Sequence, residues 1–463
     1  MRRNVATPRG RNRTLSAAAA TMAIGLVLSG CSAREPSQTD PLDRPAGHAY
    51  LYGTDGNMLN GIGEAIQEAH PNAISGMKGT VPLTPLSQSF RDRVRSIDSS
   101  LVDETYAGET YDAVVISALA AQLAGSTDSR AIAAQINGVT VGGELCDTPA
   151  QCLTLIEAGQ DIRYRGVTLG LGGFTDVGEP SASTYGILRF GPGNQLAPSL
   201  TQFVPTGNAS TASQAAPPAG GTPVEGEGPL RIGALLPITG ALATAGPPMF
   251  AAGELAVLEI NAAGGVLGMP VEWVEGDDGT SADVAMATAT RLIEEEGVQV
   301  IVGAGASGVS LAVLPIVMEA GVVLFSPCNT AARLTTEEDN GLYFRTAPPD
   351  GLQAAALTDI IVRDGTRTLS VIYRDDAYGV GLAESTRDNL VAAGLASDQI
   401  AMMPYGADAA DALLGGDTSA LDFTGLADQV RQANPDGVLI IAFDETTNIV
   451  DALVKAGITS ITN

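Results

Sequence analysis

Short apolar runs alternate with stretches of helical spacing throughout the second half of the chain, and this alternation restricts the possible folds more than any other feature. Each run is short enough to be a buried strand, and each is followed by a helical pattern of apolar residues. The runs are 230–237, 270–277, 298–302, 321–326, 369–373 and 436–443. Alternating strand and helix signals imply parallel sheets covered by helices on both faces. The sequence therefore predicts an α/β fold.

The first 31 residues have the features of an export signal. Five arginines and no acidic residue precede an apolar stretch at 17–28, which is too short to span a bilayer comfortably but suits a signal peptide. The stretch ends in Leu-Ser-Gly-Cys, which resembles a lipobox, the motif whose cysteine is diacylated. The alternative is an ordinary secretory signal with a chance cysteine. We expect residues 1–30 to be a lipoprotein signal peptide, Cys31 to carry palmitate-type lipid, and residues 31–47 to be a tether on the extracytoplasmic face of the membrane.

The size and charge of the remaining chain restrict its organisation and its partners. Roughly 430 residues exceed what one hydrophobic core usually holds, so we expect two domains. The formal net charge of −27 opposes binding to nucleic acid and to anionic lipid surfaces. We therefore expect no nucleic-acid partner, whereas the charge says little about a small ligand.

Three cysteines follow Cys31 and have different predicted roles. Cys146 and Cys152 are close enough to close a small loop, and a disulfide there would stabilise the fold by roughly 2–3 kcal/mol through chain entropy. A metal site is the alternative, but no histidine or further cysteine lies nearby in the sequence. We favour the disulfide. Cys328 has no obvious partner and is expected to be a buried thiol.

A glycine-rich segment at 303–308 allows three interpretations. It matches G-x-G-x-x-G, but it follows the third strand of its unit rather than the first, which disfavours a dinucleotide site. The free N–H groups at the start of a helix over 308–320, with the Ser307 hydroxyl beside them, suit a carboxylate. The alternative to this anion site is a plain turn with Ser307 as the helix N-cap.

Catalytic and metal-binding motifs are not evident in the sequence. Val309 breaks the G-x-S-x-G elbow around Ser307, and the chain has only His48 and His70 as imidazole bases. No H-E-x-x-H motif, zinc-ligand spacing or P-loop occurs. We therefore expect a binding protein rather than an enzyme, with no metal and no cofactor.

Several long segments resemble a known family. LRIGALLPITGALATAGPPM, ELAVLEINAAGGVLGMPVEWVEGDDGTS and VGAGASGVSLAVLPIVMEAGVVLFSPCNTAARLT resemble the first lobe of branched-chain amino-acid-type ABC transporter substrate-binding proteins. GLYFRTAPPDGLQAAAL, IYRDDAYGVGLAESTRDNLVAAG and ANPDGVLIIAFDETTNIVDALVKAGI are similar to the crossing into the second lobe and its continuation. The resemblance implies a type I periplasmic binding protein: two Rossmann-like lobes with parallel-core sheets, joined by a hinge.

The resemblance also implies that the two parts of the fold occur in swapped order. HAYLYGTDGNMLNG, near the front of the chain, is similar to the segment that the family places after the end of this sequence, and STYGILRFGPGNQL is similar to the family's C-terminal end. We interpret this as a circular permutation. The linker at 201–228 resembles the polar stretch that follows a lipobox in such lipoproteins, which suggests a duplication with loss of the outer ends; a mis-assembled gene is the alternative. It predicts that residues 48–53 lie beside strand 436–443 in one sheet. The expected organisation is lobe 2 at 48–75, lobe 1 at 76–165, lobe 2 at 166–200, a flexible Ala/Pro/Gly/Ser/Thr-rich linker at 201–228, lobe 1 at 229–349 and lobe 2 at 350–463.

The family's binding residues can be carried over to lobe 1. Ser307 matches the serine that holds the ligand α-carboxylate through its hydroxyl and backbone N–H. Thr330 matches the residue of the next loop that grips the carboxylate or the ammonium, and Asn329 contributes its backbone. The loop at 241–246 is expected to touch the ligand side chain, but it lacks the bulky aromatic residue of some relatives.

Four further binding residues carry over to lobe 2. Asp55 lies where an acidic residue pairs with the ligand α-ammonium. Tyr378 would close over the ligand, and Phe443 and Asp444 would line the cleft from a strand end. Core packing is the alternative role for Tyr378 and Phe443.

The resemblance implies that the protein captures an amino acid, or a similar small solute, by closure of the cleft and delivers it to an ABC permease. It also implies a monomer that is anchored to the membrane through lipid. Branched-chain amino acids are the family default, although amides, urea, short peptides and aromatic acids are handled by relatives. Two alternatives are a sensory ligand-binding subunit that does not transport, and a non-functional rearranged product.

Overall fold

The computed structural model describes residues 47–215, 228–406 and 421–461. Cys31, the predicted signal peptide and nearly all of the predicted tether lie outside these residues, as do residues 216–227 of the predicted linker. None of the helices in the described ranges is both long and apolar enough to cross a membrane.

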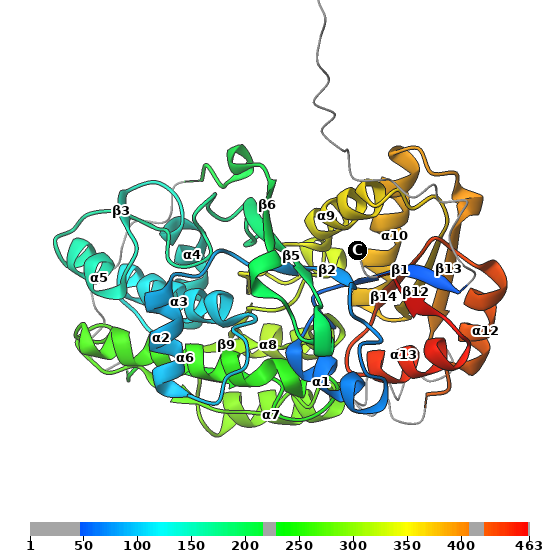
Figure 1. The fold of residues 1–463 in the computed structure, drawn as a ribbon. Coiled ribbons are helices and arrows are strands. Elements are labelled where there is room, and N and C mark those ends of the chain that lie inside the picture. The colour runs from blue at the N-terminus through cyan, green and yellow to red at the C-terminus, as the bar shows by residue number, and fades with distance from the viewer. Residues whose placement is uncertain (1–46, 216–227, 407–420, 462–463) are drawn as a thin grey trace, which may run out of the picture. The chain divides into compact units, whose positions relative to one another are not determined.

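Two sheets organise the fold, and each has a parallel core (Figure 1). We call the part built on the five-stranded sheet lobe 1 and the part built on the eight-stranded sheet lobe 2. In spatial order the sheet of lobe 1 is β11 (Tyr343–Arg345), β10 (Val323–Ser326), β9 (Val300–Gly303), β7 (Arg231–Leu235) and β8 (Glu272–Val274). The sheet of lobe 2 is β13 (Ile400–Tyr405), β12 (Leu369–Arg374), β14 (Gly437–Ile441), β1 (His48–Gly53), β2 (Lys78–Pro82), β5 (Ala182–Arg189) and β6 (Gln202–Gly207), with β15 (Thr459–Ser460) paired to β1.

Helices from both halves of the sequence cover the two sheets. The helices of lobe 1 are α2 (Gln88–Ile97), α3 (Ala107–Ala124), α4 (Ser129–Val139), α5 (Pro149–Glu157), α6 (Gly246–Ala262), α7 (Ala282–Glu294) and α8 (Ser307–Ala320). The helices of lobe 2 are α1 (Asn60–Ala69), α9 (Asp350–Arg363), α10 (Ala377–Ala392), α12 (Thr424–Ala433) and α13 (Thr446–Lys455). Helix α3 packs against α6 although about 140 residues separate them in the sequence.

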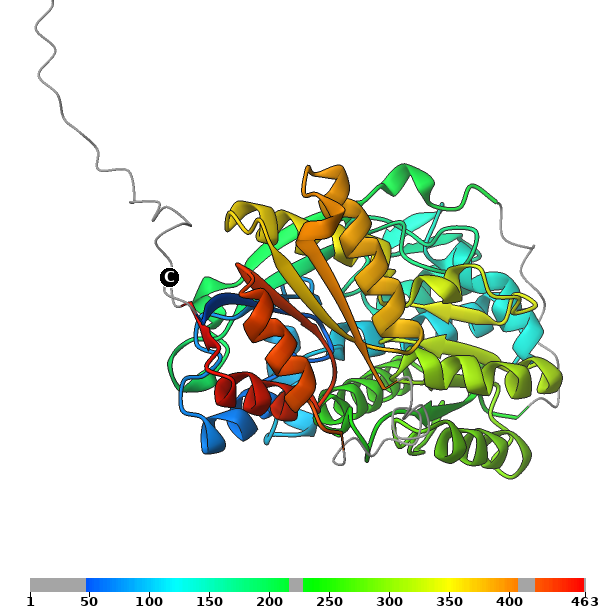
Figure 2. The ribbon, with the colours of Figure 1, turned by 90° about the vertical axis from the view of Figure 1, so that its right-hand side faces the viewer.

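The central strands of lobe 2 are mostly apolar because both faces of the sheet are buried. Val371 and Leu439 belong to the core under α9 and α10, whereas Ile372 and Ile440 belong to the core under α1, α12 and α13. Successive residues of a strand point to opposite faces, so adjacent apolar residues serve two cores. Figure 2 shows the strands of this sheet between the two groups of helices.

The predicted neighbourhood of residues 48–53 and 436–443 is confirmed. Strand β1 pairs with β14 in parallel, with Tyr50 opposite Gly437 and Tyr52 opposite Leu439. A glycine is needed in this register because a Cβ on Gly437 would lie 2.8 Å from the Tyr52 ring. The strand from the front of the chain thus occupies a central place in the sheet built by the end of the chain.

Two predicted boundaries are corrected by the sheet. Strand β2 belongs to lobe 2, so the lobe boundary predicted at residue 76 lies one strand too early. Strand β6 pairs antiparallel with β5, from Ala182 opposite Gly207 to Ile187 opposite Gln202, so the predicted linker begins with an edge strand. The error has a physical reason. An edge strand buries little apolar surface and tolerates a proline such as Pro205, so the composition of β6 resembles that of a linker.

The predicted cysteine pair forms a disulfide in lobe 1. Cys146, at the end of β3 (Glu144–Cys146), is joined to Cys152 in α5, with a Cα–Cα distance of 5.3 Å. Strand β3 pairs with β4 (Ile162–Tyr164) in a small parallel sheet. Cys328 is a buried free thiol, as predicted.

Candidate functional site

A cavity lies between the carboxyl ends of the strands of the two lobes, which is where α/β sheets usually bind ligands. Its volume is about 10 Å³, so it has room for about one water molecule. Lobe 1 provides Tyr106, Leu242, Ala245, Gly305, Ala306, Ser307, Cys328 and Thr330, and lobe 2 provides Asp55, Gly56, Tyr378 and Phe443.

Asp55 is the centre of the hydrogen bonds in this cavity. Its Oδ2 accepts from the Tyr106 hydroxyl at 2.6 Å, and its Oδ1 accepts from Gln353 Nε2 at 2.7 Å and from the Tyr378 hydroxyl at 2.8 Å. Burial raises the pKa of Asp55, and these three donors oppose part of the rise. Since Tyr106 precedes α3 and Asp55 follows β1, the bond between them joins the two lobes.

Ser307 is the first residue of α8 and faces the cavity. The N-cap of α8 is Ala306, whose side chain accepts no hydrogen bond from the helix. The alternative in which Ser307 serves as the N-cap is therefore wrong. The Ser307 hydroxyl instead accepts from the N–H of Ala331 at 3.3 Å. The first N–H groups of a helix have no partner inside it, and those of α8 begin at this cavity. The site therefore combines a hydroxyl with a helix N-terminus.

Two side chains hold the loop that leads to Ser307. Asp278 accepts from the N–H of Gly305 at 2.7 Å, and burial raises the pKa of this carboxyl to about 7. Asn329 Nδ2 donates to the carbonyl oxygens of Ala304 and Gly305, both at 2.9 Å. At Gly303, with φ +149°, a Cβ would lie 2.0 Å from the Leu235 carbonyl oxygen. Gly303 therefore allows a close approach of β9 to β7.

The predicted residues of lobe 1 are partly brought together. Ser307 and Thr330 line the cavity, and so do Leu242 and Ala245 of the predicted side-chain loop. Asn329 lies behind the cavity wall as a support: its Oδ1 accepts from the Tyr343 hydroxyl at 3.1 Å. Its side chain was not part of the prediction.

In lobe 2 three of the four predicted residues meet. Asp55, Tyr378 and Phe443 line the cavity, and the rings of Tyr378 and Phe443 stack with their centroids 5.4 Å apart and an interplanar angle of 18°. Asp444 is half-buried and does not line the cavity; its carbonyl oxygen accepts from Thr447 in the first turn of α13.

Tyr106 and Gln353 are site residues that the sequence did not reveal. Tyr106 has a left-handed backbone conformation (φ 59°) and only 2% of its surface is exposed. Gln353 lies in α9 and donates to Asp55 across about 300 residues of sequence. Neither belongs to a short motif, so no local signal could have found them.

Other acidic side chains are buried around the cleft. Burial, with a contribution from the charge of Asp55, raises the pKa of Asp350 well above its ordinary value. Burial also raises the pKa of Glu109, in the first turn of α3, to about 8. The surroundings of the cavity therefore favour neutral carboxyl groups. In the part of the chain that the structure describes, no group of three or more His, Cys, Asp or Glu side chains could hold a metal ion.

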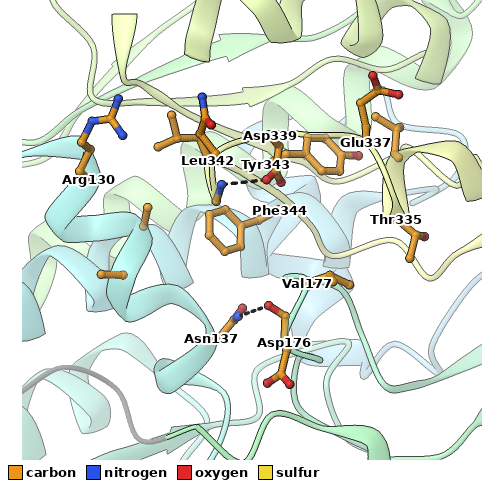
Figure 3. Close-up of a pocket in the computed structure, with 15 residues that line it drawn as sticks. Arg130, Asn137, Asp176, Val177, Thr335, Glu337, Asp339, Leu342, Tyr343 and Phe344 are labelled. Carbon is orange, nitrogen blue, oxygen red and sulfur yellow. Dashed lines mark hydrogen bonds between the residues drawn. The ribbon is translucent and has the colours of Figure 1, made fainter. Parts of the chain in front are cut away.

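A second, larger cavity lies on lobe 1 and has a volume of about 480 Å³ (Figure 3). Leu342, Tyr343 and Phe344 line it together with Arg130 and Asp339. It shares no lining residue with the first cavity and contains none of the predicted site residues. Its link to the first cavity is Tyr343, whose hydroxyl donates to Asn329.

The model of the periplasmic binding protein family matches residues 229–462, which is half of the chain. The chain belongs to this family. Its fold is that of a type I periplasmic binding protein, so the predicted fold class and the predicted family are confirmed.

Several curated proteins are similar to this periplasmic binding protein. An amino acid binding protein of Pseudomonas aeruginosa is 32% identical over 160 residues, which cover 34% of this chain and 42% of that protein. A Leu/Ile/Val-binding protein homolog of Brucella melitensis is 31% identical over 157 residues, 34% of this chain and 42% of the relative. A chemotactic signal transduction system substrate-binding protein of Halobacterium salinarum is 31% identical over 235 residues, 49% of this chain and 53% of the relative. The chain thus spans about half of these relatives or less.

Solved structures of similar proteins also match about half of the chain. An ABC transporter substrate-binding protein from Desulfitobacterium hafniense in complex with Leu is 28% identical with a TM-score of 0.40, covering 50% of this chain and 65% of that one. A leucine binding protein from Thermotoga maritima is 24% identical with a TM-score of 0.37, covering 46% and 55%.

Proposed function

We propose that this periplasmic binding protein captures an α-amino acid, or a similar small amphoteric solute, in the cleft between its lobes and delivers it to an ABC permease. The observation that carries the proposal is one cavity lined by a buried carboxylate, Asp55, and by the N-terminus of α8 at Ser307. These two features offer complementary charge to the two ends of an amino-acid backbone. The protein would bind and not catalyse.

The α-carboxylate would bind to the lobe 1 side of the cavity. A helix N-terminus presents free N–H groups and a partial positive charge, which favour an anion. The hydroxyls of Ser307 and Thr330 lie in the same wall. Asn329 and Asp278 keep this wall in place through the loop at 303–306.

The α-ammonium would bind to Asp55 on the lobe 2 side. A cation beside a buried carboxylate favours its ionised form, so the ligand would lower the raised pKa of Asp55. The solute would then be enclosed by a hinge motion that brings Tyr378 and Phe443 over it. The Tyr106–Asp55 hydrogen bond joins the lobes around a cavity with room for about one water molecule, so the lobes would have to part before the solute enters.

An apolar ligand side chain would match the polarity of the rest of the lining. Leu242, Ala245 and Phe443 are apolar, and neither Leu242 nor Ala245 has an ionisable group to pair with a charged side chain. Two relatives carry names of Leu/Ile/Val-binding proteins. A branched-chain amino acid is therefore the ligand that we propose first.

A sensory role is the second candidate, and one observation favours it. The Halobacterium relative, with a match to 49% of this chain, is named as a substrate-binding protein of chemotactic signal transduction. The same cleft would serve transport or sensing, so the membrane partner decides between them. Co-purification of the chain with a permease or with a receptor distinguishes the two.

We further propose that the chain is a circularly permuted lipoprotein held on the extracytoplasmic face of the membrane through Cys31. The central position of β1 beside β14, almost 400 residues apart in sequence, supports the permuted order. The match of the family to residues 229–462 agrees with it, because residues 48–200 then supply the remainder of both lobes. The Arg-rich start and the lipobox-like Leu-Ser-Gly-Cys segment support the anchor.

Calorimetric titration with a panel of amino acids tests the proposed binding. We expect leucine, isoleucine or valine to bind and a Ser307→Ala variant to bind more weakly. Ser129→Ala is the matched control, because Ser129 is likewise the first residue of a helix, α4, but lies outside the cavity. Absence of heat with every amino acid, in a protein that unfolds cooperatively, would contradict the proposal.

A further inference from the structure

Arg374, the last residue of β12, is a buried charge directly behind the cleft. Only 1% of its side chain is exposed, and its guanidinium carbon lies 4.1 Å from the centroid of the Phe443 ring. Its Nη1 donates to Glu445, and its Nε donates to Asp376 Oδ2 at 2.8 Å. A guanidinium over an aromatic face is held by a cation–π attraction, which is strongest when both groups are shielded from water.

Arg374 also contacts the segment that places Tyr378. Asp376 is the N-cap of α10 and accepts from the N–H groups of Tyr378 at 3.1 Å and Gly379 at 2.9 Å. Since the guanidinium binds the other oxygen of Asp376, it helps to fix the start of this helix. One side chain therefore touches Phe443 directly and reaches Tyr378 through Asp376.

The surroundings leave Arg374 little freedom to move. A Cβ on Gly379 would lie 2.1 Å from the Arg374 carbonyl oxygen, so α10 starts in close contact with the end of β12. Glu445, which follows the end of β14, is buried and also accepts from the Tyr405 hydroxyl at 2.7 Å. Arg374 thus ties together three chain segments that meet at the cavity wall of lobe 2.

We propose that Arg374 is a positioning residue: it holds the stacked rings of Tyr378 and Phe443 in the orientation that encloses the bound solute. This inference rests on the proposed function of the cleft. Burying an ion pair brings little net stability compared with apolar packing, so the planar guanidinium is better explained by the orientation that it imposes. A wall that loosens lets the solute leave sooner, and the effect therefore falls mainly on the dissociation rate.

A double-mutant cycle between Arg374 and Phe443 tests the inference. Arg374→Lys keeps the charge beside Glu445 and Asp376 but loses the planar, forked guanidinium. We expect Arg374→Lys and Phe443→Leu each to raise the dissociation constant for the preferred branched-chain amino acid about tenfold, largely by faster dissociation. The double variant is expected to bind within about threefold of the weaker single variant, because both changes remove the same contact. Effects that multiply to about a hundredfold would overturn the proposal.

A control variant and a spectrum distinguish positioning of the rings by Arg374 from a purely structural role of this residue. Tyr405→Phe removes a hydrogen bond to the same Glu445 without touching the Phe443 ring, so we expect it to lower thermal stability and leave the dissociation constant within twofold. The near-ultraviolet circular dichroism of ligand-free Arg374→Lys is expected to change as that of Phe443→Leu does. An unchanged spectrum would contradict the positioning of the rings even if the parent protein bound no amino acid. In that case the failed binding would count against the proposed function alone.

Discussion

The two sides of the cleft present different chemical groups to the cavity. At the start of α8, lobe 1 presents small residues and backbone groups, Gly305, Ala306 and Ser307. Asp278 holds them by accepting a buried hydrogen bond from Gly305, and Asn329 by donating to its carbonyl oxygen, while Tyr106 is the aromatic side chain of this wall. Lobe 2 presents long side chains, a carboxylate and two stacked rings, which depend on other side chains for their orientation. One wall is set by the main chain and the other by a network of side chains.

This difference suggests a division of labour between the lobes. A wall of main-chain groups at a helix end recognises what all α-amino acids share, the carboxylate, and needs no rearrangement to do so. A wall of side chains can supply the opposite charge and close over the solute. Substitutions in lobe 2 should therefore have larger effects on affinity than substitutions in lobe 1, and the predictions below would break or sharpen this contrast.

Asp55→Asn should have the largest effect. It removes the proposed partner of the ligand ammonium in a buried site, and the loss of one member of such a pair costs about 2–5 kcal/mol, or a dissociation constant raised about 30-fold or more. The ligand-free variant should unfold at the same temperature or higher, because burial already disfavours the ionised form of Asp55. Calorimetric titration and thermal unfolding measure the two effects. Asp388→Asn, an exposed carboxylate on α10, is the control; binding within threefold of the parent would refute the role of Asp55.

Glu109→Gln tests whether lobe 1 depends on a neutral carboxyl group. The pKa of Glu109 is raised to about 8, so its folded state retains a proton that the unfolded chain releases above about pH 4.5. Its contribution to stability is fully present below that pH and is lost as the pH rises toward 8. The variant should therefore gain about 2–4 kcal/mol relative to the parent between pH 5 and 8. Urea unfolding at several pH values checks this, and a constant difference would contradict it.

Ser307→Ala should weaken amino-acid binding less than Asp55→Asn does. The substitution removes one hydrogen bond from a hydroxyl to a charged group. Its loss costs about 1.5–2 kcal/mol of binding free energy, which raises the dissociation constant roughly tenfold to thirtyfold. The N–H groups at the start of α8 remain in place, so the main-chain part of the wall still binds the carboxylate. If Ser307→Ala abolished binding while Asp55→Asn kept it, the contrast between the lobes would be reversed.

The sequence predicted lining residues in both walls, and the meeting of the two in lobe 1 has a physical reason. Ser307 and Thr330 follow consecutive parallel strands, so their meeting at one sheet edge follows from the topology alone. Asp444 was expected in the cleft beside Phe443, but neighbouring residues after a strand point in different directions, and only Phe443 lines the cavity. Local patterns specify elements and edges, and they do not specify which of two adjacent side chains turns inward.

No sequence pattern could predict the contacts between distant segments of the chain. Tyr106 reaches Asp55 from the other lobe, and Gln353 reaches it from α9. The edge strand β6 was missed because it buries too little apolar surface to differ from a linker. The neighbourhood of β1 and β14 was predicted correctly because the family resemblance supplied the long-range order that periodicity lacks.

Tyr106→Phe should have the smallest effect on affinity and isolates the hydrogen bond between Tyr106 and Asp55, which joins the two walls. The ring stays, so the apolar lining is kept, while Asp55 loses the donor at 2.6 Å. A hydrogen bond to a charged group contributes about 1.5–3 kcal/mol in isolation, but Gln353 and Tyr378 still satisfy Asp55, so we expect a loss of about threefold to tenfold. If the bond stabilises closure, the change will appear as faster dissociation in stopped-flow measurements. A slower association with unchanged dissociation would instead mean that Tyr106 guides the solute into the open cleft, and the two walls would then be coupled before closure rather than by it.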